Sequence, residues 1–133
     1  MKRIVFLALF FSSLFADEFN MQVFKPVTST CPPAWLDDMK TLTKDNVDIV
    51  SMVNVSGLKY KIGVPRELQS CNTSILNDYV FEGNVPASAI KEFFENMPKD
   101  SFGLAMPANQ NDKEIKTVFV MYDDGSFKEF GKY

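Results

Sequence analysis

Apolar and polar residues follow two different periods along this chain, and these periods predict its strands and helices. Short stretches rich in β-branched and aromatic residues predict strands at residues 21–25 and 47–53. Apolar residues spaced three or four apart predict two amphipathic helices. The first begins at Pro33, and the second follows Pro86 and stops at Pro98. Their apolar faces consist of Trp35, Leu36, Met39 and Leu42 in the first helix and of Ile90, Phe93, Phe94 and Met97 in the second.

A third helix and a hairpin are predicted between these two helices. Ser56 is a typical cap for a short helix that runs to residue 62, where Gly63 ends it. Residues 72–76 and 79–82 predict a hairpin, because the Asn-Asp pair between them tolerates the left-handed backbone of a tight turn.

The C-terminal third predicts a long loop followed by a second hairpin. Residues 101–116 are largely polar and are expected to form the loop. Residues 117–122 and 126–130 alternate as paired strands do, and Asp124-Gly125 marks their turn. The predicted order is strand, helix, strand, helix, hairpin, helix, hairpin.

Strand, helix and strand followed by hairpin and helix is the element order of the thioredoxin fold. We therefore expect one thioredoxin-like α/β domain, a sheet flanked by helices, with the C-terminal hairpin as an addition. This order brings three distant segments to one edge of the sheet: the loop with Cys31, the start of the first hairpin at Cys71, and its end at Gly83-Asn84. Such an edge commonly carries the functional site of an α/β sheet.

The N-terminus predicts export. Lys2 and Arg3 precede an apolar run at residues 4–11, a pattern typical of a signal peptide that ends at residue 16. We expect residues 1–16 to be removed and residues 17–133 to form a single periplasmic or secreted domain. The apolar run is shorter than the roughly 20 residues that a membrane-spanning helix needs, and no membrane span is expected in the mature chain.

Composition narrows the possible partners and chemistry. Without Lys2 and Arg3 of the predicted signal peptide, the chain has 12 basic and 17 acidic residues, so nucleic acid is not an expected partner. Histidine is absent, which removes the commonest general base and the commonest metal ligand. The two cysteines, Cys31 and Cys71, are the main candidates left. In an oxidising compartment such a pair forms a disulfide by default.

The two cysteines also suggest a redox function or a metal site. Cys31 lies where thioredoxins keep a reactive thiol, but Pro32 and Pro33 have no N–H groups to lower its pKa. Enzyme activity is therefore not expected. Two thiolates can instead hold Cu(I), a soft ion that accepts few ligands, and Met106 could add a thioether. Glu82 is a single acid, expected at the surface without a catalytic role.

Several short motifs identify a resemblance. They are Gly63-Val64-Pro65 followed by Ser70-Cys71-Asn72-Thr73, then Glu82-Gly83-Asn84-Val85-Pro86, and finally Gly103-Leu104-Ala105-Met106-Pro107. With Trp35 at its spacing from the Cys31 loop, this set resembles a family of small exported, thioredoxin-like, metal-binding proteins. That family is catalogued as domain of unknown function four-eleven and is associated with copper handling.

The resemblance implies a metal site that has lost most of its ligands. A Cys-Gly-Cys-Cys loop in the family corresponds to Ser29-Thr30-Cys31-Pro32 here, and Asn72 and Asn84 stand where the family has histidine. The expected rim of the site is Ser29, Pro32, Asn72 and Asn84.

The resulting functional hypothesis is a non-catalytic, copper-associated protein with a degenerate site. It would carry a Cys31–Cys71 disulfide or a weak Cu(I) site, with Met106 as a further ligand. Two alternatives stay open. One is a thiol–disulfide redox protein or adapter that uses Cys31, and the other is an interaction domain that holds an unknown protein partner.

Overall fold

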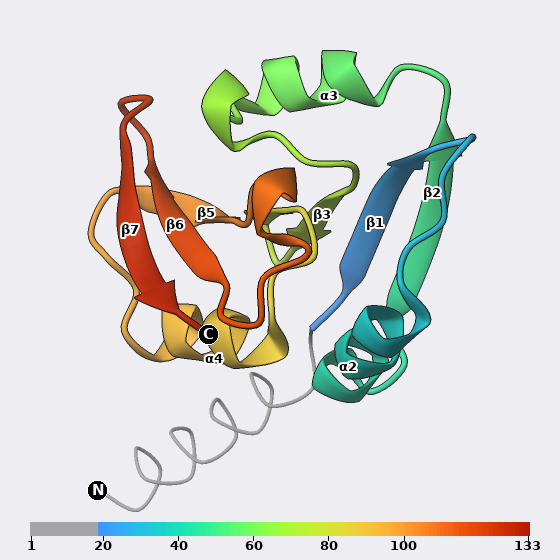
Figure 1. Cartoon of the computed structure of the whole chain (residues 1–133), viewed down its shortest axis with the longest axis horizontal. Coiled ribbons are helices and arrows are strands. Elements are labelled where there is room, and N and C mark those ends of the chain that lie inside the picture. Colours follow the sequence, from blue (N-terminus) through green and yellow to red (C-terminus); the bar gives the residue numbers. More distant parts are fainter. Residues whose placement is uncertain (1–18) are drawn as a thin grey trace, which may run out of the picture.

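The computed structural model describes residues 19–133. The predicted signal peptide, residues 1–16, lies outside the described residues. The fold is mixed α/β and is organised around one seven-stranded sheet (Figure 1). Within residues 19–133, no helix is both long enough and apolar enough to cross a membrane.

The sheet joins neighbouring strands of both orientations. Its spatial order is β2-β1-β3-β4-β5-β6-β7, in which β1 is parallel to β2 and β4 is parallel to β5. All other neighbours are antiparallel. The strands are β1 (Met21–Pro26), β2 (Val47–Met52), β3 (Thr73–Leu76), β4 (Tyr79–Glu82), β5 (Ser101–Ala105), β6 (Thr117–Tyr122) and β7 (Phe127–Lys132).

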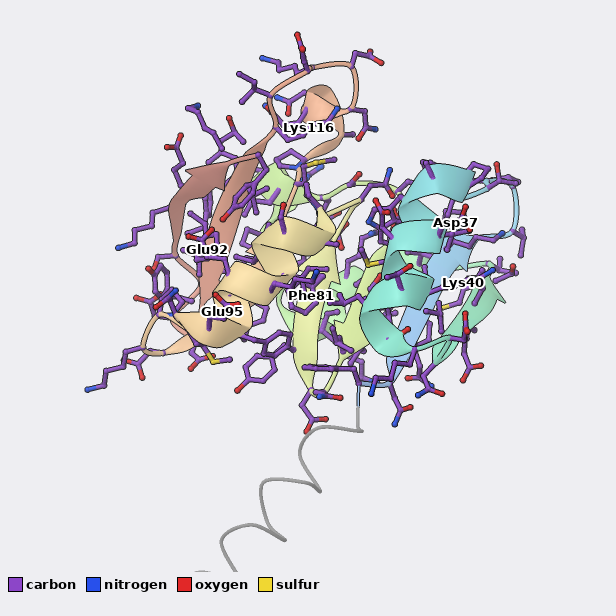
Figure 2. All side chains as sticks on the ribbon, turned by 90° about the horizontal axis from the view of Figure 1, so that it is seen from below. Asp37, Lys40, Phe81, Glu92, Glu95 and Lys116 are labelled. Carbon is purple, nitrogen blue, oxygen red and sulfur yellow. The ribbon has the colours of Figure 1, made fainter. Side chains whose placement is uncertain are left out.

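Three helices pack on the two faces of this sheet in the described part of the chain. They are α2 (Pro33–Thr43), α3 (Val55–Ile62) and α4 (Ala87–Glu95). Figure 2 shows α2 and α4 side by side over one face, with Asp37 on α2 and Glu92 on α4 at the surface. Phe81 of β4 is fully buried beneath them. The third helix, α3, packs against the other face.

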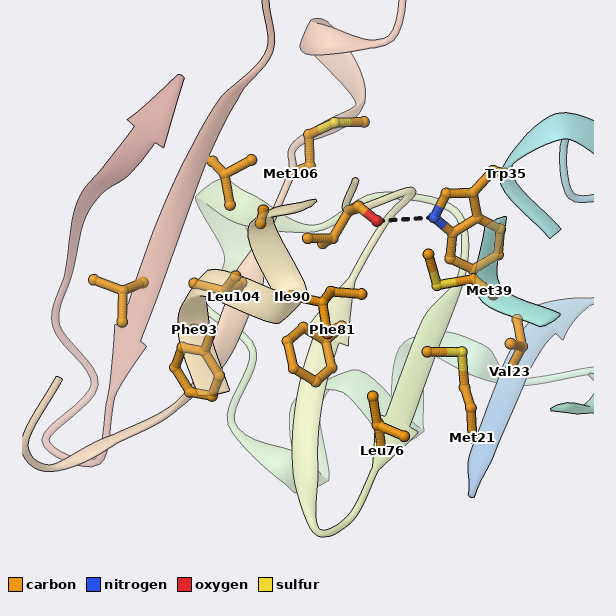
Figure 3. Close-up of a cluster of buried hydrophobic side chains, with 14 residues drawn as sticks. Met21, Val23, Trp35, Met39, Leu76, Phe81, Ile90, Phe93, Leu104 and Met106 are labelled. Atoms are coloured by element: carbon orange, nitrogen blue, oxygen red, sulfur yellow. Dashed lines mark hydrogen bonds between the residues drawn. The ribbon is translucent and has the colours of Figure 1, made fainter. Parts of the chain in front are cut away.

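The larger core lies between the sheet and the α2–α4 layer. Figure 3 shows this cluster, in which Trp35 and Met39 of α2 meet residues of β1, β3, β4 and β5. Trp35 also donates its Nε1–H to the carbonyl oxygen of Val85 at 3.0 Å, which ties the start of α2 to the segment before α4. A smaller cluster under α3 includes Leu68, Val80 and Met121. Each face of the sheet therefore has its own core.

The predicted long loop at residues 101–116 is wrong for its first five residues. They form β5, which pairs with both β4 and β6 inside the sheet, and residues 108–110 form a single 3₁₀ turn. The loop was predicted because residues 101–116 are largely polar, and β5 itself contains a glycine, Gly103. Here the glycine is required, because a Cβ at this position would lie 1.7 Å from the carbonyl oxygen of Val80. The C-terminal addition is therefore three strands, not one hairpin.

Two helix boundaries also differ from the prediction. Asn54, not Ser56, caps α3, because its side chain accepts a hydrogen bond from the backbone N–H of Gly57 at 3.0 Å. The last helix ends at Glu95, so Met97 lies beyond it and is 36% exposed. The predicted turn of the first hairpin is confirmed, since Asn77 and Asp78 both have positive φ angles.

Candidate functional site

One edge of the sheet gathers the segments that carry the cysteines. In the strand register Phe24 pairs with Thr73, Thr73 with Glu82, and Glu82 with Ala105. The ends of β1, β4 and β5 therefore lie beside the start of β3. We call this the carboxyl edge, and it carries residues 27–32, 70–72, 83–86 and 106–107. Sequence order alone predicted the meeting of the first three segments.

Cys31 occupies the loop between β1 and α2. Its side chain is half-buried and packs against the larger core. Burial raises the pKa of the Cys31 thiol above its ordinary value of 9.0, the nearby Cys71 raises it further, and Lys25 partly opposes both effects. The helix that follows begins at Pro33 and has no side-chain cap. The Cys31 thiol is thus neither acidified nor fully exposed.

Cys71 immediately precedes the first hairpin and is exposed. Its thiol donates a hydrogen bond to the Ser29 hydroxyl, with 3.1 Å between sulfur and oxygen. Lys25 steadies that loop, because its Nζ donates to the carbonyl oxygen of Ser29 at 2.7 Å. The structure thus brings Ser29 to Cys71, and Cys31 lies two residues further along the same loop. Both cysteines are free thiols here, and their disulfide stays a prediction.

Three buried polar atoms near the carboxyl edge have no hydrogen-bond partner in the described structure. They are Asn72 Nδ2, Ser74 Oγ and Asn84 Oδ1. Side chains alternate along a strand, so Asn72 and Ser74 face the same side as the buried Leu76, which belongs to the α2–α4 core. Asn72 is only 2% exposed. A buried polar group without a partner costs about 1–3 kcal/mol, so these atoms mark a locally unsatisfied region.

The remaining predicted site residues lie at or near the same edge. Met106 directly follows β5 and is 2% exposed within the larger core (Figure 3), so it does not lie in an open loop. Pro32 is exposed at the start of α2. Among residues 19–133, no group of three or more Cys, Asp or Glu side chains is arranged to hold a metal ion. A soft ion with two sulfur ligands would not need such a group.

Sequence reasoning missed one important residue at this edge, because it placed Glu82 at the surface. Glu82 is 0% exposed and forms an ion pair with Lys59 of α3, which is 4% exposed, at 2.5 Å. Its carboxylate also accepts hydrogen bonds from the Thr73 hydroxyl at 2.6 Å and from the backbone N–H of Ser70 at 2.8 Å. One signal was present: Glu82 and the buried Val80 share a face of β4.

A comparison with protein families matches a segment that carries several of the candidate site residues. A family described as "Protein of unknown function, DUF411" matches residues 68–109, which include Cys71, Asn72, Glu82, Asn84 and Met106. No curated protein matches the chain.

Two solved structures have a similar fold. They are form 1 and form 2 of a copper resistance protein, copG, with TM-scores of 0.67 and 0.69. Form 1 is 22% identical to this chain and form 2 is 21% identical. The alignments cover 87% and 86% of this chain and 98% of each copG chain. The chain is therefore similar in fold to a copper resistance protein over most of its length, and its residues 68–109 match a family of unknown function.

Proposed function

We propose that this chain is an exported, non-catalytic, copper-associated protein that holds Cu(I) weakly between Cys31 and Cys71. The observation that carries the proposal is geometric: the Cys71 thiol donates a hydrogen bond at 3.1 Å to the hydroxyl of Ser29, which lies two residues before Cys31 in the same loop. Two thiolates repel each other, and a soft cation between them would relieve that repulsion. The fold similarity to a copper resistance protein adds support.

The donor set at this edge suits a soft ion of low coordination number. Two sulfurs are enough for Cu(I), whereas a structural zinc site would need about four good ligands. Met106 is the remaining candidate for a thioether ligand. Asn72 and Asn84 supply amide groups, which are poor ligands for Cu(I) and would instead surround the site.

The proposal also includes a thioredoxin-like fold and a disulfide in the metal-free protein. The first four strands and their helices form a thioredoxin-like unit, which their order β2-β1-β3-β4 supports. Without metal in an oxidising compartment, Cys31 and Cys71 form a disulfide that closes a loop of about 40 residues. The chain-entropy model assigns such a loop roughly 3–4 kcal/mol of stabilisation.

Redox catalysis by Cys31 is the weaker candidate. A catalytic thiol needs a lowered pKa, but burial and Cys71 raise the pKa of Cys31. Neither Pro32 nor Pro33 has an N–H group to donate to a thiolate. The arrangement therefore favours capture of a metal ion over attack on a disulfide.

Anaerobic Cu(I) titration of the reduced protein against a chromophoric chelator tests this function. We expect one Cu(I) per chain, and we expect Cys31→Ser or Cys71→Ser to abolish uptake. Met106→Leu should weaken uptake if the thioether contributes, with the exposed Met97→Leu as its matched control. Undiminished uptake by the double cysteine variant would refute the proposal.

A further inference from the structure

The buried Glu82 carboxylate is the centre of a polar network that no thiol chemistry explains directly. One oxygen, Oε2, contacts Lys59 Nζ at 2.5 Å and the backbone N–H of Ser70 at 2.8 Å. The other oxygen, Oε1, accepts from the Thr73 hydroxyl at 2.6 Å. Lys59 also donates to Thr73 Oγ1 at 2.6 Å, which closes the network. All three side chains are at least 96% buried.

These contacts hold residues on both sides of Cys71 in the sequence. Ser70 is the residue before Cys71, and Thr73 lies two residues after it. The backbone N–H of Gly83, next to Glu82, donates to the carbonyl oxygen of Asn72 at 2.8 Å. The segment from Ser70 to Thr73 is thus held to the end of β4 by main-chain and side-chain bonds together. Cys71 has little freedom of position while these bonds persist.

Burying an ion pair seldom stabilises a fold more than apolar residues of similar size would. Stability alone is therefore a weak reason for the Lys59–Glu82 pair. Charge-assisted hydrogen bonds do fix geometry, because they are short and directional. Glu82 accepts such bonds from the Ser70 N–H and the Thr73 hydroxyl, and these two bonds fix the position of the segment that carries Cys71.

We propose that Glu82, held by Lys59, is a positioning residue that fixes the Ser70–Thr73 segment so that the Cys71 sulfur faces the Cys31 sulfur. The inference rests on the proposed function, because it takes the two cysteines as the working pair. It assigns no contact between Glu82 and a metal ion. Its consequence is a preorganised pair of sulfurs, which loses less conformational entropy when it binds a ligand or forms a disulfide.

The effective concentration of the two thiols measures this preorganisation without any metal. In glutathione buffer, one cysteine thiolate attacks glutathione disulfide and releases one glutathione thiol. The second cysteine thiolate then attacks the mixed disulfide, the Cys31–Cys71 bond forms, and the second glutathione leaves as a thiol. Two cysteines are oxidised and one glutathione disulfide is reduced. The equilibrium constant of the net reaction is the effective concentration.

Two variants remove the positioning contacts in different ways. Lys59→Met/Glu82→Leu deletes both charges together and so avoids leaving one buried charge unpaired. Ser70→Pro removes the N–H donor together with the serine hydroxyl, and it leaves both charged side chains of the ion pair in place. Gln69 before it has ψ near 140°, which suits a residue that precedes proline. The matched control is Phe93→Leu, which replaces a buried residue of α4 whose ring packs against the rings of Tyr79, Phe81, Phe94 and Phe130.

Both test variants should lower the effective concentration about 10-fold or more, the range known for outer partners of metal ligands. Lys59→Met/Glu82→Gln keeps one acceptor for Ser70 and should recover part of the loss. The Phe93→Leu control should keep the wild-type value even if its stability falls. An unchanged value in Ser70→Pro, an equal loss in Phe93→Leu, or no Cys31–Cys71 disulfide in the wild type would overturn the inference.

Cu(I) binding separates this inference from the proposed function. A wild-type protein that closes its disulfide at high effective concentration, with the expected losses in the variants, supports the positioning role of Glu82 even if it takes up no Cu(I). Uptake of Cu(I) by wild type and variants with equal affinity, together with equal effective concentrations, would leave the proposed function standing and remove the role of Glu82.

Discussion

Gly103→Ala tests whether β5 is as tightly placed in the sheet as the structure requires. An added Cβ would lie 1.7 Å from the carbonyl oxygen and 2.7 Å from the carbonyl carbon of Val80, which are backbone atoms and cannot turn away. Real Cβ contacts start near 3.0 Å, so β4 and β5 would have to separate by more than about 1 Å. Hydrogen bonds between strands weaken steeply over such a displacement.

The expected cost follows from the pairing that is lost. Three residue pairs join β4 to β5, and each lost hydrogen bond costs about 0.5–1.5 kcal/mol, so we expect about 1.5–4.5 kcal/mol of destabilisation. Gly125→Ala is the matched control, because it meets nothing within 4 Å but has a φ of +88°. It should cost only about 1–2 kcal/mol.

Urea unfolding of Gly103→Ala and Gly125→Ala, followed by fluorescence of Trp35, the single tryptophan, measures both losses. A smaller loss for Gly103→Ala than for Gly125→Ala would refute the placement of β5 against β4.

Three further predictions concern the helices and the thiols. Trp35→Phe keeps an aromatic ring but leaves the Val85 carbonyl without its donor, and we expect a loss of about 1–3 kcal/mol by circular dichroism in urea; no loss would contradict this contact. Asn54→Ala removes the cap of α3 and should cost about 1 kcal/mol in thermal unfolding; an unchanged midpoint would argue against the cap. Cys71 should be alkylated before the half-buried Cys31. Because the pKa of Cys31 is raised above 9.0, its alkylation rate, followed by mass spectrometry, should still be rising with pH beyond pH 9; fast modification of Cys31 at pH 7 would contradict this order.

Elements with a strong local period could be predicted from the sequence. The helix that starts at Pro33 and the turn at Asn77-Asp78 depend on signals within a few residues, and both are confirmed. The strand β5 could not be found in this way, because its pairing with β4 spans the intervening helix α4. Only the neighbouring strand explains why a glycine is needed at Gly103.

The candidate site, too, could be predicted from the sequence only in part. The element order was enough to place Cys31 and Cys71 at one edge, because the chain direction of each strand follows from the connections. Strand alternation places Glu82 on the same face as Val80, but the sequence does not show its ion pair, because Lys59 reaches Glu82 only when α3 packs on the sheet. Tertiary packing, not local sequence, decides whether a charged residue is a surface group or the centre of a buried network.

The coordination of Cu(I) tests the central claim most directly. X-ray absorption at the copper edge of the Cu(I)-loaded, reduced protein reports the number and kind of atoms around the ion. We predict a shell of two sulfur atoms from Cys31 and Cys71, with at most one further sulfur from Met106. The sulfur shell should disappear in the Cys31→Ser/Cys71→Ser variant. A shell of nitrogen or oxygen atoms in the wild type, or a spectrum that is unchanged by the double substitution, would contradict the two-thiol site.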